Sequence, residues 1–176
     1  MYINIIAAYC KNNGIGINNN LPWKYSSDLK KFKNLTIGNG NNAIIMGKNT
    51  WLSLNSNGLK NRDNLILSKS LLINNKIDNS DNIVKTFQNL QLLLDFINKK
   101  NYDEIWIIGG EKIYDLFLNN SILEIDYIYI TYIYDNYECN KYFPKIDLNA
   151  YAFISKSIHN NTSRIYDIVY KNYKSK

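Results

Sequence analysis

Hydrophobic residues gather in short continuous runs along the first two thirds of the chain, and stretches with a helical spacing of apolar positions separate these runs. A short apolar run that ends at a turn residue is typical of a strand buried on both faces. We therefore expect strands at Ile3–Tyr9, Ala43–Met46, Asn64–Leu67, Ile83–Lys85 and Glu104–Ile108.

Helical periodicity fills the segments between these strands. We expect helices from Ser26 or Ser27, as N-cap, to about Leu35, at Thr50–Leu54, at Thr86–Lys99, and around Ile113, Tyr114 and Phe117. Strands that alternate with helices predict an α/β fold, with a mainly parallel, twisted central sheet of about eight strands and flanking helices.

The last third of the chain has a different pattern. Tyr127–Tyr134, Tyr151–Ile158 and Ile165–Tyr173 are long runs rich in β-branched and aromatic residues. The last two should form a C-terminal antiparallel hairpin at the sheet edge, with its turn at His159–Ser163. We expect His159, the only histidine, to be a solvated loop residue.

Composition limits the class of protein. The chain has 176 residues, of which 45% are hydrophobic, so we expect one domain over residues 1–176 with one core. Its net charge of +6 is scattered, which suits polyanionic small molecules and argues against nucleic acid as a partner. Cys10 lies in an apolar run, so we expect it to be a small core residue. No segment has the pattern of a secretion signal or the length of a membrane span, so we expect a cytoplasmic protein.

Asp28 is the most informative polar residue. It is the only acid in Ser26–Lys33, on a helix face shared with Leu29 and Phe32, and the lysines should occupy the other face. Buried without a partner, a carboxylate costs several kcal/mol, so such a site should hold a protein cation or a ligand with paired donors. The alternative is a solvated acid that the helix dipole favours.

Two of the predicted strands end at a glycine turn that leads into a helix, and such a turn can bind phosphate. Gly47–Thr50 and Gly109–Lys112 each lead into a helix, and Ser68 and Lys69 end a third strand. Either glycine turn alone could be purely steric, but together they favour a dinucleotide site. Lys48 and Lys69 suggest the extra ribose phosphate of NADPH, unless they are simply solvated lysines. The chain contains no Gly-x-Gly-x-x-Gly motif, no Walker P-loop and no metal-ligand spacing.

These residues belong to a longer series of motifs, which resembles the dihydrofolate reductase family in order and separation over nearly the whole chain. The motifs are Ile6-Ala7-Ala8, Gly14-Ile15-Gly16, Leu21-Pro22-Trp23, Asp28-Leu29-x-x-Phe32-Lys33, Ile45-Met46-Gly47-Lys48-x-Thr50-Trp51, Arg62-x-Asn64, Leu67-Ser68-Lys69, Ile107-Ile108-Gly109-Gly110, Tyr114, Thr131 and Phe143-Pro144.

The resemblance implies a role for Asp28 in binding and catalysis. Asp28 would accept two hydrogen bonds from the amino group and the adjacent ring nitrogen of a dihydropterin, a geometry that suits the two coplanar oxygens of a carboxylate. Thr131 would brace Asp28 by a hydrogen bond, and a proton would reach the pterin through water near Leu21 and Trp23. The catalytic set implied is Asp28, Leu21, Trp23, Thr131 and Tyr114.

The resemblance also implies two binding sets. Arg62 would bind a glutamate carboxylate of the folate tail, and the substrate set is Ile6, Ala8, Asp28, Leu29, Phe32, Lys33, Leu54, Leu59, Arg62, Ile108 and Thr131. The NADPH set is Ala8, Ile15, Gly16, Asn19, Asn20, Leu21, Gly47, Lys48, Asn49, Thr50, Leu67, Ser68, Lys69, Ile108, Gly109, Gly110, Glu111, Lys112, Ile113 and Tyr114.

Several positions depart from the family pattern, among them Lys48, Lys69, Leu52, Gly58 and Asn140. Lys48 and Lys69 stand where the family often has arginine, so phosphate contacts should be less bidentate. The Ile15–Asn20 loop resembles a lid, and Asn140 stands where bacterial members often have an acid that helps to hold it.

The resemblance implies NADPH-dependent reduction of dihydrofolate to tetrahydrofolate, for one-carbon and thymidylate metabolism, by a monomer that antifolate inhibitors would bind. One alternative is a reductase of the same fold that acts on another pterin or on a pyrimidine of riboflavin synthesis. The other is a noncatalytic nucleotide- or RNA-binding protein, which the basic charge suggests.

Overall fold

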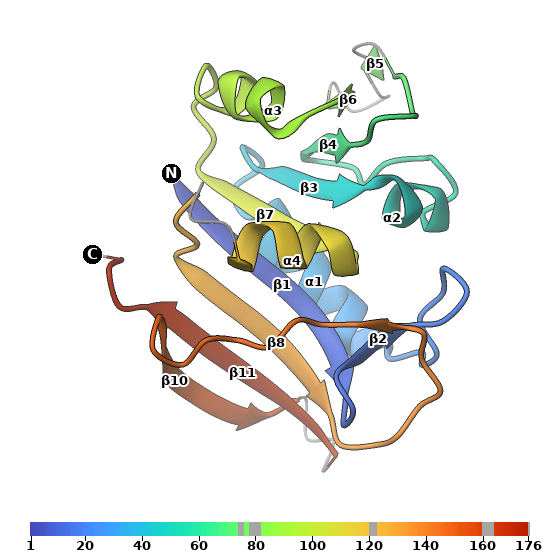
Figure 1. The fold of residues 1–176 in the computed structure, drawn as a ribbon, viewed down its shortest axis with the longest axis vertical. Helices are drawn as coiled ribbons and strands as arrows, with labels where there is room; N and C mark the ends of the chain where they lie inside the picture. The colour runs from blue at the N-terminus through green and yellow to red at the C-terminus, as the bar shows by residue number, and fades with distance from the viewer. Residues whose placement is uncertain (74–75, 78–81, 120–122, 160–163, 176) are drawn as a thin grey trace.

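A nine-stranded sheet forms the centre of the computed structural model, which describes residues 1–73, 76–77, 82–119, 123–159 and 164–175. The strand order is β10-β11-β8-β1-β7-β3-β4-β6-β5 (Figure 1). Its strands are β1 (Tyr2–Cys10), β3 (Ala43–Gly47), β4 (Asp63–Leu67), β5 (Lys76–Ile77), β6 (Ile83–Phe87), β7 (Glu104–Gly109), β8 (Tyr127–Ile133), β10 (Tyr151–Ile158) and β11 (Ile165–Asn172).

Six neighbouring strands of this sheet run parallel. The parallel pairs are β8 with β1, β1 with β7, β7 with β3, β3 with β4, and β4 with β6. β11 and β10 add an antiparallel hairpin beside β8, and the short β5 pairs antiparallel with β6. The mainly parallel α/β sheet and its C-terminal hairpin are thus confirmed.

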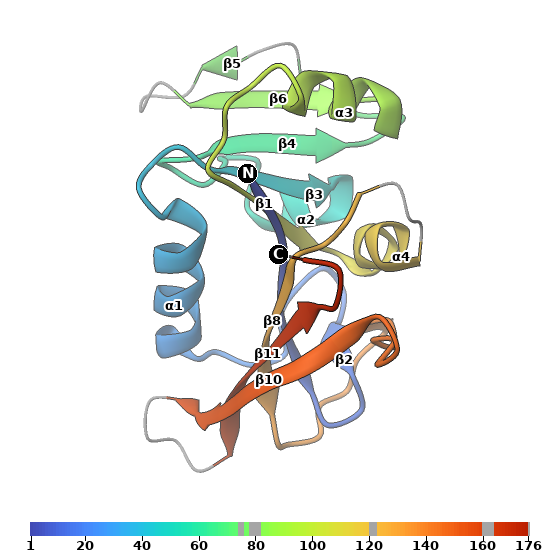
Figure 2. The same cartoon turned by 90° about the vertical axis from the view of Figure 1, so that its left-hand side faces the viewer.

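Helices cover both faces of the sheet. They are α1 (Ser26–Ile37), α2 (Lys48–Ser53), α3 (Leu90–Ile97) and α4 (Glu111–Asn119). Figure 2 shows α1 on one face, with α3 and α4 on the other. The β1 side chains Ile5 and Ile6 belong to different apolar clusters, since successive residues of a strand point to opposite faces.

Local chemistry explains where the structure differs from the sequence-based boundaries. The third helix begins at Leu90, not Thr86, because β6 continues to Phe87 and the Asn89 side chain caps the helix by accepting a hydrogen bond from Leu92 N at 2.9 Å. The pattern gave no sign of β5, or of β2 (Gly14–Gly16) and β9 (Lys141–Tyr142), which pair with each other outside the main sheet.

None of the helices in the described part of the chain has the length and apolar character needed to cross a membrane.

Candidate functional site

Asp28 lies in the first turn of α1 and is buried, with 9% of its surface exposed. It forms no hydrogen bond or ion pair with any residue that the structure describes. Its charge nevertheless affects Tyr114. Burial raises the pKa of Tyr114, and the Asp28 carboxylate raises it further. The inward position expected for Asp28 is therefore confirmed, and its two oxygens remain available to a ligand.

The serine cap expected at the start of α1 is wrong. Tyr25 is the N-cap residue, and no side chain caps this end of the helix. The Ser27 hydroxyl lies 3.0 Å from Nε2 of His159 instead. This contact joins the first turn of α1 to the end of β10.

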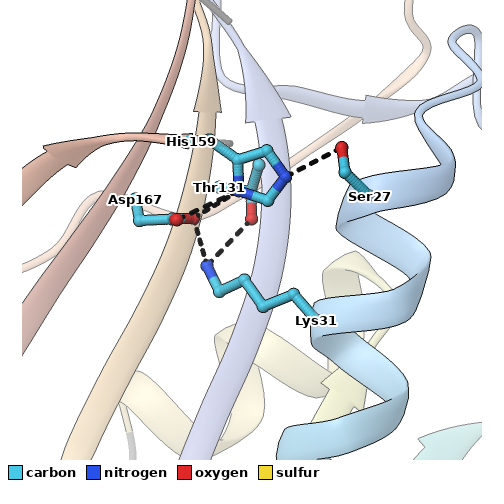
Figure 3. A network of polar contacts seen from close by, with 5 residues as sticks. All are labelled: Ser27, Lys31, Thr131, His159 and Asp167. Carbon is cyan, nitrogen blue, oxygen red and sulfur yellow. Dashed lines mark hydrogen bonds and ion pairs between the residues drawn. The ribbon is translucent and has the colours of Figure 1, made fainter. Parts of the chain in front are cut away.

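His159 was expected to be solvated, and that expectation is wrong, since only 3% of its surface is exposed. Its Nδ1 lies 3.0 Å from both carboxylate oxygens of Asp167 on β11 (Figure 3). The proposed turn at His159–Ser163 lies mostly outside the described residues, because residues 160–163 are not among them. The histidine thus joins a polar network between the hairpin and α1.

Lys31 also lies on the sheet side of α1, so the expectation that the lysines share the outer face is wrong at this position. Its Nζ forms an ion pair with Asp167 and donates to the Thr131 hydroxyl oxygen at 3.2 Å (Figure 3). Lys30 and Lys33 are exposed, as expected. Thr131 was expected to bond to Asp28, but the hydrogen bond that the structure gives it comes from Lys31. The spacing of Lys31, three residues after Asp28, was the only sequence signal for this contact.

The expected apolar wall residues that share a cluster come from three elements and the loop that follows α2. Those that pack in one cluster are Ile6 of β1, Phe32 of α1, Ile108 of β7, and Leu54 and Leu59 of the loop. Ala8 packs in a different cluster, with Trp23, and Leu29 is 55% exposed. The structure thus brings together five of the seven expected wall residues.

Arg62 is a buried cation, 4% exposed, at the start of β4. Its Nε donates to the Lys60 carbonyl at 3.1 Å, Nη1 donates to the Thr36 hydroxyl, and the guanidinium lies 6.0 Å from the centre of the Phe32 ring. Burial lowers its pKa to about 10, so Arg62 stays charged near neutral pH. No carboxylate among the described residues pairs with it, so its guanidinium can bind a carboxylate of a ligand.

The segment before α1 is held by backbone hydrogen bonds to residues on either side of β9. Asn140 N donates to the Gly16 carbonyl at 3.0 Å, and Phe143 N donates to the Asn13 carbonyl at 2.8 Å. The Asn140 side-chain amide also donates to the Asn18 side chain at 3.3 Å. Ile15 is half-buried, whereas Asn19 and Asn20 are exposed.

Two residues at the end of this segment differ in exposure. Leu21 is 48% exposed, and Trp23 is 5% exposed. The Trp23 Nε1 atom is buried and has no hydrogen-bond partner among the described residues. A buried donor without a partner is uncommon, and it suits a water or ligand acceptor.

Three parallel strands end side by side at Gly47, Leu67 and Gly109, as their registers show. Glycine at two of these ends allows close packing against α4. A Cβ at Gly47 would lie 3.0 Å from the Ile113 side chain, and one at Gly109, where φ is +97°, would lie 2.6 Å from the Tyr114 ring. These close contacts with Ile113 and Tyr114 require glycine at both positions.

Cationic and hydroxyl side chains surround the same strand ends. Lys48 Nζ donates to the Ser70 hydroxyl at 3.0 Å, and the Ser68 hydroxyl accepts from Leu71 N at 3.1 Å. Thr50 is half-buried, whereas Asn49, Lys69 and Lys112 are exposed. Glu111 is used structurally, since it accepts a hydrogen bond from Tyr142 N at 2.9 Å. Apart from Glu111, this donor set suits phosphate groups.

Tyr114 of α4 is anchored to the central strand β1. Its hydroxyl donates to the Ile6 carbonyl at 2.8 Å, so α4 is fixed against the central strand from the face opposite to α1. Figure 2 shows α1, which carries Asp28, and α4, which carries Tyr114, on opposite faces of the sheet.

The chain is similar to known proteins in both sequence and structure. The solved structure of dihydrofolate reductase from Enterococcus faecalis, complexed with NADP(H) and RAB-propyl, has a TM-score of 0.77 at 22% identity and covers 98% of this chain and 97% of that chain. Dihydrofolate reductase of Schistosoma mansoni is 33% identical over 156 residues, 84% of this chain and 80% of that protein. The Gallus gallus enzyme is 32% identical over 162 residues, 88% of this chain and 84% of that protein. The family model for dihydrofolate reductase matches residues 2–175. The chain belongs to the dihydrofolate reductase family.

Proposed function

We propose that this protein reduces 7,8-dihydrofolate to 5,6,7,8-tetrahydrofolate with NADPH, as a monomeric, single-domain, cytoplasmic enzyme. Membership of the dihydrofolate reductase family supports the reaction class. The observation that carries the proposal is the buried Asp28 carboxylate, which has no partner among the described residues at the start of α1. A buried charge of this kind requires a ligand that supplies donors.

The pterin ring offers donors of this kind. Asp28 accepts hydrogen bonds from the amino group and the adjacent ring nitrogen, and both of its oxygens are used. Ile6, Phe32 and Ile108 contact the pterin and aminobenzoyl rings, and Leu54 and Leu59 complete the apolar surface. Leu29, which is exposed without a ligand, becomes covered when the rings bind.

Arg62 binds a carboxylate of the glutamate tail. Its Nε and Nη1 are already held by Lys60 and Thr36, so the guanidinium is fixed before the substrate arrives. Fixing a side chain in advance lowers the entropic cost of binding. Lys33, exposed on the outer face of α1, adds positive charge beside this tail.

The strand ends at Gly47, Leu67 and Gly109 suit a dinucleotide. The two strand-to-helix junctions at Gly47 and Gly109 lie side by side, and Lys48, Thr50, Ser68 and Lys69 supply donors for phosphates. When bound there, NADPH supplies the hydride. The Ile15–Asn20 loop covers the nicotinamide side and excludes water.

Proton delivery uses the free donor of Trp23. A water that accepts a hydrogen bond from Trp23 Nε1 is held near the pterin nitrogen that is protonated. The Asp28 charge favours this protonation electrostatically, without itself handing over the proton. Tetrahydrofolate then serves one-carbon and thymidylate metabolism, and antifolate inhibitors with a pterin-like amino group compete for Asp28.

The test follows the absorbance of NADPH during incubation with purified protein and dihydrofolate, with NADH and substrate-free controls. Substrate-dependent loss, much faster with NADPH than with NADH, is the expected result. If folded protein binds NADPH but leaves dihydrofolate unchanged, the substrate is another pterin or a pyrimidine. Salt-sensitive RNA binding without NADPH oxidation would instead favour a noncatalytic protein.

A further inference from the structure

We propose that Cys10 and Cys139 form a redox-active dithiol, a modification site at which a small disulfide such as oxidised glutathione converts the two thiols into one disulfide. This cross-link joins the end of β1 to the connection between β8 and β9, beside the Ile15–Asn20 loop. The thiol chemistry is independent of the proposed function. Only its effect on turnover rests on that function, which assigns the loop to the nicotinamide side.

The two sulfur atoms already lie next to each other. Cys10 Sγ is 3.9 Å from Cys139 Sγ, although 129 positions separate the residues along the chain. Both thiols are free, and the chain has two cysteines in total, so no other thiol of the same chain competes for either of them. A disulfide bond is about 2.05 Å long, so closing it takes a movement of roughly 2 Å, shared between the two side chains.

Exposure gives the two thiols different roles. Cys10 is completely buried, and its sulfur donates a hydrogen bond to Asn12 Oδ1 at 2.9 Å. Cys139 is half-buried, and its chain neighbours Glu138 and Asn140 are exposed. A reagent from solvent therefore meets Cys139 first. Cys10 can react only afterwards, with the sulfur of Cys139.

The reaction proceeds by two thiol–disulfide exchanges. The Cys139 thiolate attacks one sulfur of oxidised glutathione, so the S–S bond of the reagent breaks, a mixed disulfide forms and one glutathione thiolate leaves. The Cys10 thiolate then attacks the Cys139 sulfur and displaces the second glutathione thiolate. The two departing thiolates take up the two protons that the cysteines lose. The protein gives up two electrons, and oxidised glutathione accepts them.

The surroundings of Cys139 make this exchange slow. Burial raises the pKa of the Cys139 thiol, and the nearby Cys10 sulfur raises it further; a backbone hydrogen bond with Gly16 acts in the opposite direction. Only the thiolate attacks a disulfide, so little of Cys139 is reactive near neutral pH. In a reducing compartment the pair stays reduced, and it responds when the pool of small thiols becomes oxidised for long enough.

The cross-link would act on the Ile15–Asn20 loop because Cys139 touches the strand that leads into it. A Cβ at Gly14 would lie 2.4 Å from Cys139 Sγ, so the sulfur packs directly against this glycine. The next residue, Asn140, donates from its backbone to the Gly16 carbonyl at 3.0 Å. Oxidation therefore adds a covalent restraint to hydrogen bonds that can break, and it limits opening of the loop.

The test begins with purified protein and oxidised glutathione at mildly alkaline pH, followed by peptide mapping by mass spectrometry without reduction. Wild-type protein should lose two hydrogen atoms, carry no glutathione and yield linked Cys10 and Cys139 peptides, which dithiothreitol separates. Cys10→Ser keeps a donor to Asn12 and should stop at a glutathione adduct on Cys139. Cys139→Ser should stay unmodified, because its remaining thiol is buried.

Two further measurements follow the loop. Hydrogen exchange of the backbone amides over residues 13–20 should slow in the oxidised wild-type protein, whether or not the protein is a reductase. Oxidation should also lower kcat for dihydrofolate reduction severalfold, and dithiothreitol should restore it. Cys139→Ser is the control for both, since the same treatment should leave its amide exchange and kcat unchanged. Cys10→Ala repeats the Cys10→Ser test in case a buried serine destabilises the fold.

A stable glutathione adduct on wild-type protein, two unreacted thiols, or a cross-link between two copies of the chain would overturn the dithiol. Unchanged amide exchange in cross-linked protein would overturn the restraint on the loop, and an unchanged kcat would overturn its effect on turnover. Failure of the reduced wild-type protein to oxidise NADPH with dihydrofolate would overturn the proposed function alone, because the cross-link and the amide exchange are measured without substrate.

Discussion

Replacing Arg62 by leucine should separate ligand binding from folding stability. The guanidinium is buried without a carboxylate partner among the described residues, so it destabilises the free protein while it prepares a site for the folate tail. We expect Arg62→Leu to lose affinity for folate and to keep, or slightly gain, stability. Most substitutions at a buried polar residue lower the stability of the fold.

The expected stability change follows from two opposing terms. Burial lowers the Arg62 pKa from the usual 12.5 to about 10. A difference of that size corresponds to a cost on the order of 3 kcal/mol for the buried cation. Its hydrogen bonds to Lys60 O and Thr36 Oγ1 have a charged donor and return roughly 1.5 kcal/mol or more each. The two terms nearly cancel, and a buried leucine adds apolar contact, so the variant should keep the wild-type stability or exceed it slightly.

This difference has a defined pH dependence. Because the folded-state pKa is depressed, the cost of the cation is fully present below about pH 10 and disappears as the pH rises from about 10 to 12.5. The stability difference between the variant and the wild-type protein should thus be constant at neutral and mildly acidic pH. A slope in that range would indicate another titrating group.

The binding loss should be specific to the tail. Losing a hydrogen bond from a charged donor costs about 2 kcal/mol or more, roughly thirtyfold in Kd. The assay is quenching of tryptophan fluorescence by folate, by a pterin without the glutamate tail, and by NADPH, together with urea unfolding. Only folate should bind more weakly. Arg164→Leu is the matched control, because the Arg164 side chain is 65% exposed.

Two results would refute this reasoning. Equal weakening of folate and NADPH would mean that Arg62 is structural rather than a ligand contact. A loss of stability of about 3 kcal/mol or more would mean that the hydrogen bonds of Arg62 outweigh its burial cost.

Other variants test the remaining parts of the proposed site. Asp28→Asn should fold but lose roughly two to four orders of magnitude in turnover, measured by NADPH absorbance, and near-normal turnover would refute its role. Lys48→Ala with Lys69→Ala should narrow the preference for NADPH over NADH in kcat/KM; an unchanged ratio would place the extra phosphate elsewhere. Gly109→Ala combines a φ of +97° with a Cβ 2.6 Å from a buried tyrosine ring, and should cost about 3 kcal/mol in urea unfolding. Gly40→Ala, with φ of +94° and nothing within 4 Å, is its control and should cost less.

Sequence patterns predicted the sheet because buried parallel strands are marked by continuous apolar runs. They also predicted the inward position of Asp28, which the structure confirms. His159 and Lys31 were misjudged for a different reason. Their environment depends on Ser27, Thr131 and Asp167, which come together only when α1 packs beside the hairpin. A histidine in a polar segment looks solvated until its distant partners are known.

The short β2 and β9 strands were missed because their pairing consists of backbone hydrogen bonds. Asn140 N to the Gly16 carbonyl is such a contact, and no hydrophobic alternation accompanies it. The side-chain contact from Asn140 to Asn18 is exposed, so residue type at this position gave little information about how the segment is held.

The central place of β1 determines when the fold can form during synthesis. Its partners are β7 and β8, with Tyr2 opposite Glu104 and Asn4 opposite Tyr127. A strand that leaves the ribosome early must therefore wait until residues as far as 133 have followed it. In the meantime β3 and β4 can already pair with each other and with β6. Nascent chains should thus carry an unpaired apolar strand for most of translation, which makes chaperone supply a determinant of yield.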